Sequence, residues 1–328
     1  MTHVILLIVA AVAIYFSCEW FVNAVEWLGR RLNVGPLAVG TILAAFGTAL
    51  PESVVTFVAV VFGSSPSEKD LGVGAAMGGP LVLATIAYGV VGWMLLARRR
   101  TGAAELGDTR KLARDQSWFM AVFVVKVALG LVAFAVKPWL GLVFFAVYGV
   151  YFWRELRGGG DPGEQEDLEP LLLQRRRAQP AGWAVVAQTL GTLAVIFLAS
   201  QLFVRQLDAI GPMLGLPAAV TALLLSPIAT ELPETMNAII WVRQGKTRLA
   251  LANVSGAMMI QATVPSGLGL LFTPWRFDTV LVISGLVTMA SIGYLWLLLR
   301  RGRLTVRRLS LAGLLYLVFA AALYPALS

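Results

Sequence analysis

The sequence predicts an all-α polytopic membrane protein with ten transmembrane helices arranged as two inverted repeats of five. Three observations lead to this fold class. First, 58% of the 328 residues are hydrophobic and only 13% are charged, whereas soluble domains carry about 25% charged residues. Second, the apolar residues fall in segments of about 20 residues, the length that an α-helix needs to cross a bilayer. Third, the second half of the chain repeats motifs of the first half.

Ten apolar segments are separated by short polar stretches. In lipid, an α-helix satisfies its own backbone hydrogen bonds, and the shorter alternating segments of a β-barrel are absent from this sequence. We therefore expect helices over the ranges Thr2–Leu28, Pro36–Phe62, Leu71–Ala97, Ser117–Val136, Pro138–Trp153, Gly182–Leu207, Pro217–Trp241, Arg248–Phe272, Phe277–Leu299 and Leu309–Pro325.

The basic residues predict the orientation. Of the 26 Lys and Arg residues, 21 lie in the odd-numbered loops, four lie at the opposite ends of the helices, and Lys126 lies inside a helix. Because Lys and Arg gather in cytoplasmic loops, both termini are expected to be extracytoplasmic. The basic cytoplasmic loops account for the net charge of +8. Binding to nucleic acid is not inferred from this charge, because the sequence carries no nucleic-acid-binding motif. The expected location is the plasma (inner) membrane, as an integral protein.

One long polar stretch divides the chain. We expect a first five-helix repeat over residues 1–157, a flexible cytoplasmic linker over residues 158–180, and a second five-helix repeat over residues 181–328. The linker holds Gly158-Gly159-Gly160 and an acidic run. A calcium sensor is an alternative for this run, but the run lacks the spacing of an EF-hand loop.

The two halves of the sequence can be aligned at their repeated motifs without gaps. When Glu19–Glu52 is aligned with Gln201–Glu234, Leu50-Pro51-Glu52 falls on Leu232-Pro233-Glu234, and Thr48 falls on Thr230. Five helices in each half make the second copy enter the membrane from the opposite side. Such inverted repeats are typical of secondary transporters, which bind their substrates near the midplane between the repeats.

Glu52 and Glu234 are therefore the leading candidates for a functional site. Each lies near the middle of an apolar segment, where a carboxylate is costly and is functional by default. The alternative is a structural carboxylate that is hydrogen-bonded to a neighbouring helix.

Each carboxylate belongs to a set of oxygen groups. The preceding proline has no N–H, so the carbonyl four residues before it loses its donor. A threonine four residues before the glutamate lies on the same helical face. These groups are the carbonyls of Gly47 and Ala229 and the hydroxyls of Thr48 and Thr230. Two facing sets would form an all-oxygen site suited to a hard cation such as Ca²⁺, without the His or Cys ligands of a zinc or copper site.

The motifs resemble a known family. Gly47-Thr48-Ala49-Leu50-Pro51-Glu52 is similar to the G-T-S-L-P-E signature of the sodium/calcium exchanger family, and Ser226–Glu234 is similar to its second copy. The segments Asp70–Pro80 and Leu249–Gln261 resemble the G-N-x-x-G-S-N segments of that family. The resemblance, to a divergent prokaryotic-type member, implies ten helices and exchange of Ca²⁺ against Na⁺ or H⁺ by alternating access. It also implies that Glu52, Glu234, Thr48 and Thr230 bind the ion.

The chain departs from the family pattern at several oxygen ligands. Five positions that are polar in the family have lost their polar side chain in this sequence: Ala49, Ala75, Gly79, Leu83 and Ala257. Glu231 adds a carboxylate to the second motif. Asn253 and Gln261 retain amide side chains. Fewer neutral oxygens should weaken Na⁺ sites, and Glu231 is a group that can carry a proton. We therefore include Glu231, Asn253 and Gln261 among the expected ligands, and slightly favour H⁺ over Na⁺ as the counter-ion.

The sequence thus predicts a secondary cation antiporter for Ca²⁺ or a related divalent cation. A passive cation channel and an intramembrane enzyme with paired carboxylates are the alternatives. No catalytic residue, cofactor or protein partner is inferred, only the lipid bilayer and inorganic cations. Two buried charges keep open roles. Glu19 is a gating or proton-relay group or bonds a neighbouring helix, whereas Lys126 forms a structural ion pair or extends to the membrane surface.

Overall fold

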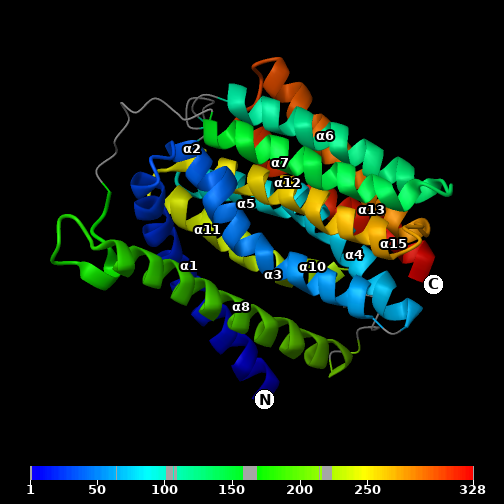
Figure 1. Ribbon diagram of the computed structural model, residues 1–328, viewed down its shortest axis with the longest axis horizontal. Coiled ribbons are helices and arrows are strands. Elements are labelled where there is room, and N and C mark those ends of the chain that lie inside the picture. The colour runs from blue at the N-terminus through cyan, green and yellow to red at the C-terminus, as the bar shows by residue number, and fades with distance from the viewer. Residues whose placement is uncertain are drawn as a thin grey trace.

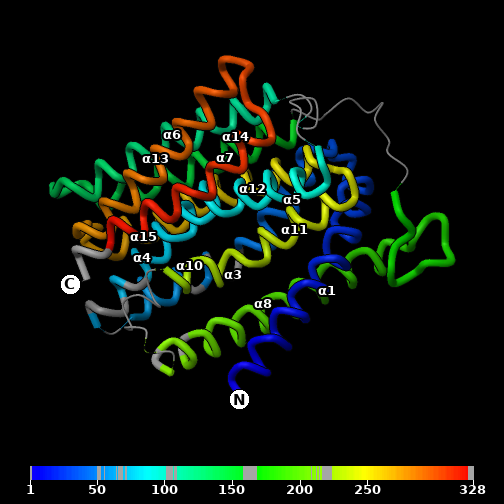
Figure 2. Tube along the Cα trace, turned by 180° about the vertical axis from the view of Figure 1, so that it is seen from behind, coloured from blue at the N-terminus to red at the C-terminus, as the bar shows by residue number. Residues whose placement is uncertain are grey.

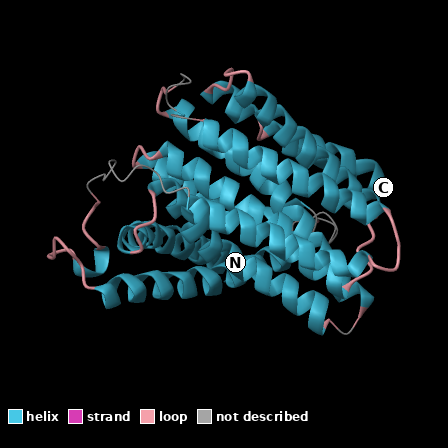
Figure 3. Ribbon diagram, turned by 45° about the horizontal axis from the view of Figure 1, so that its top comes forward, coloured by secondary structure: helices cyan, strands magenta, loops and turns pink. Residues whose placement is uncertain are grey.

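A computed structural model of the chain describes residues 2–63, 65–100, 106, 109–157, 168–213, 215 and 224–327. Over these residues every regular element is a helix and none is a strand (Figure 3). The all-α prediction is confirmed. A few side chains within the helices lie outside this description, and the side chain of Glu52 is one of them.

The described part of the first half forms five helical groups, as predicted. The second and third groups are continuous through π-helical turns (η1, η2 and η3) that the sequence did not predict. The bounds are α1 (Thr2–Arg31); α2 (Pro36–Ala38), η1 (Val39–Ala44), α3 (Ala45–Phe57) and η2 (Val58–Phe62); α4 (Pro66–Val82), η3 (Leu83–Ala87) and α5 (Tyr88–Ala97); α6 (Arg110–Leu131); and the 3-10 turn η5 (Lys137–Trp139) with α7 (Leu140–Arg157).

The described part of the second half also forms five helical groups. The expected seventh segment begins outside the described residues, and the tenth is divided into two helices. The bounds are the 3-10 turn η6 (Leu172–Gln174) before α8 (Gly182–Met213); α10 (Ser226–Thr230) with α11 (Leu232–Arg243); α12 (Thr247–Phe272); α13 (Thr279–Arg300); and α14 (Val306–Leu311) with α15 (Leu314–Leu327).

The fourth segment differs most from its expected range of Ser117–Val136, because α6 begins at Arg110 and ends at Leu131. Its end is fixed by a side chain. The Lys137 ammonium donates to the carbonyls of Leu129, Val132 and Trp275 at 3.3, 2.8 and 3.1 Å. A lysine that binds the last carbonyls of a helix satisfies acceptors that have no intrahelical donor.

Six described helical segments are each long and apolar enough to cross a membrane. The remaining groups are shorter, more polar or divided. The six segments are Thr2–Arg31, Gly72–Ala97, Gly182–Gly211, Thr247–Phe272, Thr279–Arg300 and Val306–Leu323.

Helix α12 runs through the centre of the bundle (Figure 1) and contacts α3, α4, α6, α7 and α11. Most of its side chains are buried, including the polar side chains of Asn253 and Gln261. Small residues allow this close packing. A Cβ atom on Gly256 would lie 2.1 Å from the carbonyl oxygen of Thr41, so only glycine allows the backbone of η1 to approach α12 so closely.

Equivalent helices of the two halves make equivalent contacts. Helix α7 packs on α12, and its counterparts α14 and α15 pack on α5 and η3. Helix α6 packs on α12, and its counterpart α13 packs on α4. Helices α1 and α8, the first of each half, pack along each other and form a pair at one side of the bundle (Figure 2). The two halves are therefore related as repeats in space as well as in sequence.

The described part of the linker is bound to this helix pair, in contrast to the expected flexible connection. The indole N–H of Trp27 donates to Glu169 O at 2.9 Å, and the amide N–H of Leu172 donates to Asn23 Oδ1 at 3.0 Å. The amide N–H of Leu173 donates to Gln188 Oε1 at 2.8 Å. These bonds join α1, α8 and the linker at one end of the bundle.

Candidate cation-binding site

The two Leu-Pro-Glu motifs lie on α3 and at the junction of α10 and α11. The first motif is part of a continuous helix. The second contains a break, because Glu231 lies between the two helices with φ −88° and ψ 8°, and Pro233 lies in the first turn of α11. A proline in a first turn removes no helical hydrogen bond. The N–H of Glu231 is directed to the carbonyls of Pro227 and Ala229, so Ala229 O is less free than the sequence predicted.

The motif threonines bind their own helices. The hydroxyl of Thr48 donates to Ala44 O at 3.1 Å, and the hydroxyl of Thr230 donates to Pro227 O at 3.1 Å. Thr48 is buried and Thr230 is partly buried. Since each hydroxyl gives its hydrogen to a carbonyl, the oxygen keeps lone pairs that can bind a cation.

Glu231 and Gln261 form a buried pair. Gln261 Nε2 donates to Glu231 Oε1 at 2.7 Å, and Gln261 is 1% exposed and Glu231 is 0% exposed. Gln261 Oε1 is buried and has no hydrogen-bond partner among the described residues. Helix α4 approaches this pair at Gly79, where a Cβ atom would lie 2.3 Å from Gln261 Oε1 and 2.6 Å from Glu231 Oε1. The absence of a side chain at Gly79 therefore makes room for the pair.

Glu234 is 1% exposed and lies in the first turn of α11. Asn253 Nδ2 donates to the backbone carbonyl of Glu234 at 3.2 Å. The other amide atom, Asn253 Oδ1, is buried without a partner among the described residues. The structure thus brings an amide of α12 to the backbone of the second motif, and leaves an acceptor oxygen beside it.

Sequence reasoning missed Asn237, which is fully buried on α11 with both amide atoms unpartnered in the described part of the chain. The signal was available, because Asn237 lies three residues after Glu234 and therefore on the same helical face. Residues 47–52 of α3 carry the first motif, but the side chain of Glu52 is outside the described residues. Among described side chains, no three His, Cys, Asp or Glu residues come together.

The α1–α8 pair covers the two motifs. The thiol of Cys18 on α1 is directed at Pro233 O, 3.7 Å away. Gly47 faces both helices of the pair, since a Cβ atom there would lie 3.0 Å from Phe21 and 3.1 Å from Leu193. Glu19 is half-buried on the same helix. The helix pair thus lies directly against both copies of the motif.

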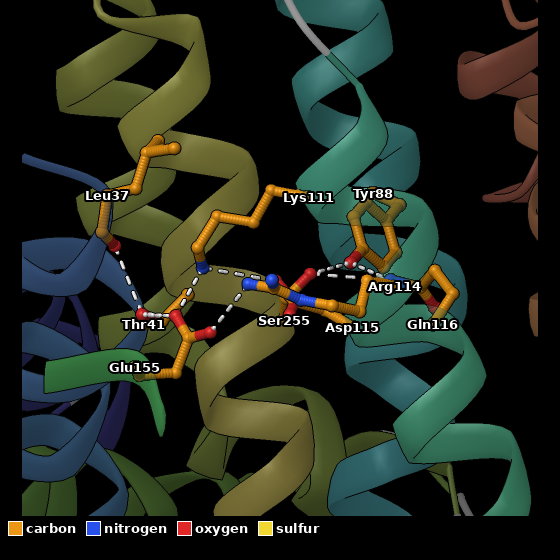
Figure 4. A network of polar contacts seen from close by, with 9 residues as sticks. All are labelled: Leu37, Thr41, Tyr88, Lys111, Arg114, Asp115, Gln116, Glu155 and Ser255. Carbon is orange, nitrogen blue, oxygen red and sulfur yellow. Dashed lines mark hydrogen bonds and ion pairs between the residues drawn. The ribbon is translucent and has the colours of Figure 1, made fainter. Parts of the chain in front are cut away.

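A second network of polar contacts surrounds Glu155 and Asp115 (Figure 4). Glu155 on α7 accepts hydrogen bonds from Thr41 at 2.8 Å and from Arg114 at 3.2 Å, and it also contacts Lys111. Asp115 on α6 accepts from Lys111 at 3.3 Å. The network continues through Gln116, Tyr88 and Ser255. It joins five helical groups, and nothing in the sequence pattern pointed to it.

Comparisons with known proteins agree with this arrangement. The chain matches the sequence model of the family described as "Sodium/calcium exchanger protein" over residues 2–156 and 184–324. It is 26% identical to the inner membrane protein YrbG of Escherichia coli (strain K12) over 283 residues, 83% of this chain and 81% of that protein. It is 24% identical to CaxA of Alkalimonas amylolytica over 314 residues, 92% of this chain and 91% of that protein. The solved structure of the sodium-calcium exchanger NCX_Mj has the same fold, with a TM-score of 0.76, 18% identity, and coverage of 98% of this chain and 99% of that one.

Proposed function

Because the chain belongs to the sodium/calcium exchanger protein family, we propose that it exchanges Ca²⁺ or a related divalent cation for Na⁺ or H⁺ by alternating access. The transported ion is bound between the two Leu-Pro-Glu motifs, near the membrane midplane. Glu52 and Glu234 are the central carboxylates, with oxygens from Thr48 and Thr230. The carbonyls of Gly47 and Ala229 complete the set.

One observation carries the proposal. Glu231 and Glu234 are both buried beside α12, in the apolar centre of a bundle of membrane helices. Carboxylates at this depth are rare and expensive, and they mark ion pathways. Two amide oxygens that have no hydrogen-bond partner among the described residues, those of Gln261 and Asn253, lie with them. Carboxylate and amide oxygens are ligands that Ca²⁺ prefers.

The packing of the α1–α8 pair supports alternating access. The pair contacts the motifs at Cys18, Phe21 and Leu193, so a movement of the pair relative to α3 and α11 would change access to the carboxylates. Rigid-body movement of one bundle against another around a fixed midplane site is how inverted-repeat transporters alternate.

The counter-ion follows from the ligand set. Na⁺ needs several close oxygens, and Ala49, Gly79, Leu83 and Ala257 supply none from their side chains. Glu231 instead adds a carboxylate, and neighbouring carboxylates in a low dielectric do not all ionise readily without a cation. Release of a proton on binding of the divalent cation, and its return when the cation leaves, would complete an exchange cycle. We slightly favour H⁺ for this reason.

The test is uptake of radioactive Ca²⁺ into proteoliposomes under an imposed Na⁺ or H⁺ gradient. Glu52→Gln and Glu234→Gln keep the side-chain shape and remove one charge each, so we expect uptake to fall to the level of protein-free vesicles. The control is Glu169→Gln, which removes an exposed linker carboxylate. Wild-type uptake in either motif variant would place the ion elsewhere, and uptake that needs no counter-ion gradient would indicate a channel.

The same vesicles test the counter-ion. Robust Na⁺-driven uptake that ignores the pH gradient, and that survives Glu231→Ala, would contradict coupling to protons.

A further inference from the structure

Lys126 is a fully buried lysine in the second half of α6. Its ammonium donates to the carbonyl oxygen of Ala76 on α4 at 2.6 Å and lies 4.9 Å from the centre of the Phe123 ring. The indole N–H of Trp275 binds the carbonyl of Lys126 at 3.2 Å and holds the backbone. The side chain therefore has a fixed place inside the bundle.

Of the two roles expected for Lys126 from the sequence, the structure contradicts one and shows no partner for the other among the described residues. A side chain that is 0% exposed does not extend to the membrane surface. The ion pairs formed by described residues do not include Lys126. Among the described residues, the ammonium contacts a carbonyl dipole and the face of an aromatic ring, both of which attract cations.

The Ala76 carbonyl is available because of a proline. Pro80 lies inside α4, and it has no N–H to donate to the carbonyl four residues before it, which is that of Ala76. The second repeat has Val254 and Met258 at the equivalent positions. The equivalent helix α13 holds no Lys or Arg before Arg300. The first half thus has both a carbonyl freed by a proline and a lysine that binds it. The equivalent positions of the second half have neither the proline nor the lysine.

The ammonium lies beside the helix that has lost the most oxygen ligands. Helix α4 and the turn η3 that continues it have Ala75, Gly79 and Leu83 where α12 has Asn253, Ala257 and Gln261. The Ala76 carbonyl is one helical turn from Gly79, which approaches Glu231 and Gln261. A freed carbonyl in a dry interior is a ligand that a monovalent cation such as Na⁺ would accept, and in this structure the lysine has taken it.

We propose that the Lys126 ammonium is a fixed cation of the transport core, which occupies an oxygen that a mobile monovalent cation would otherwise bind and so lowers by one the number of monovalent cations exchanged per divalent cation. The inference rests on the proposed antiport.

The decisive variant separates the charge from the hydrogen bond. Lys126→Met alone leaves the Ala76 carbonyl without a donor, which costs stability whatever the role of the charge. In Lys126→Met combined with Pro80→Ala, the new N–H at position 80 can donate to Ala76 O within α4. A lysine that only satisfies the carbonyl would be dispensable in this double variant. Lys126→Arg keeps the charge, and Lys126→Gln keeps a donor without the charge.

The first measurement is the number of monovalent ions exchanged per Ca²⁺, taken in proteoliposomes from the counter-ion gradient at which net Ca²⁺ flux vanishes. We expect the wild-type number in Lys126→Arg and one more in Lys126→Met, which leaves the Ala76 carbonyl vacant. In the double variant the N–H at position 80 occupies that carbonyl, so the wild-type number should return. If Lys126→Met does not fold, Lys126→Ala is measured in its place with the same expectation. A wild-type number in the variant with a vacant carbonyl would reduce Lys126 to a structural donor.

The second measurement does not depend on transport. Thermal unfolding of the detergent-solubilised protein is followed over a NaCl series, with choline chloride at equal ionic strength as the control. We expect a Na⁺-specific rise in Tm in Lys126→Met that is larger than in the wild type and in the double variant, because the vacated carbonyl binds the cation. Equal Na⁺ dependence would overturn the inference. Failure of wild-type vesicles to exchange any cation would instead contradict the proposed function, and would leave this measurement valid.

Discussion

The missing side chain at Gly79 determines how closely α4 approaches the buried Glu231–Gln261 pair. Any Cβ atom at this position would lie within 2.6 Å of both side chains. Those atoms are the ends of flexible side chains, so a substitution displaces them at little cost in stability. Its effect should therefore fall on ion binding, through the position of the carboxylate, rather than on folding.

We expect Gly79→Ala to weaken Ca²⁺ binding about tenfold, or ~1.4 kcal/mol, with a small change in Tm. The measurement is the concentration dependence of Ca²⁺ uptake together with thermal unfolding. Gly74→Ala is the matched control, because it lies on the same helix and its Cβ atom would meet nothing within 4 Å. Unchanged Ca²⁺ affinity in Gly79→Ala would show that the Glu231–Gln261 pair lies outside the binding site.

At the residue scale, the sequence identified Glu231, Asn253 and Gln261, although not Asn237, and it did not predict the contacts between them. Glu231, Asn253 and Gln261 stand out because polar residues are unexpected in apolar segments. The pairing of Gln261 with Glu231 was not predictable, since it depends on how α12 packs against the break between α10 and α11. The same holds for Lys126, whose partner is a backbone carbonyl on another helix.

At the scale of elements, the network around Glu155 holds the ends of several helices together. Glu155 is 4% exposed and accepts hydrogen bonds from α6 and η1. Asp115 is 2% exposed in the same network and precedes the expected fourth membrane segment, which begins at Ser117. Burial raises the pKa of Asp115 to about 6, although the neighbouring Lys111 opposes the rise.

This pKa gives the network a pH dependence of known sign. The carboxyl group has a pKa of about 3.9 in an unfolded chain, so the folded protein binds more protons between about pH 4 and pH 6. Its contribution to stability is therefore present below about pH 4 and is lost as the pH rises through 6. An asparagine in place of Asp115 cannot ionise and should not show this loss.

We expect Asp115→Asn to gain stability relative to the wild type, on the order of 3 kcal/mol at most, when the pH rises from about 4.5 to about 7.5. The measurement is the difference in Tm between variant and wild type at the two pH values. Asp70→Asn is the control, since it removes the same charge from an exposed position. A difference in Tm that does not change with pH would show that Asp115 is ionised throughout.

The long helices were predictable to within a few residues, because about 20 apolar residues are needed to cross a bilayer. The π-helical turns in the second and third groups were not, since their additional residue is accommodated by packing against other helices. The break before Pro233 and the unbroken helix around Pro51 also differ, although the two motifs are alike in sequence. The break falls at Glu231, which stands where the first motif has Ala49.

At the scale of the whole molecule, the internal repeat made the architecture predictable. Matching motifs in two five-helix halves predict equivalent contacts, and the structure has them. The pairing of α1 with α8 follows the same symmetry, because each is the first helix of its half. The attachment of residues 168–180 to this pair has no counterpart in the repeat, and a composition rich in glycine and charge gave no sign of it.

The orientation of the molecule in the membrane remains a prediction that its own chemistry makes easy to test. Cys18 is the one cysteine in the sequence, and it is fully buried between helices. It should therefore react slowly with a membrane-impermeant maleimide, so that the native chain serves as an unlabelled background.

Arg175 in the linker and Arg276 between α12 and α13 are exposed and lie at opposite ends of the helices. The excess of basic residues at the Arg175 end favours the cytoplasm for that end. We expect Arg276→Cys to be labelled in intact cells and Arg175→Cys only after the cells are opened. Labelling of Arg175→Cys from outside, with Arg276→Cys protected, would invert the topology and place both termini in the cytoplasm.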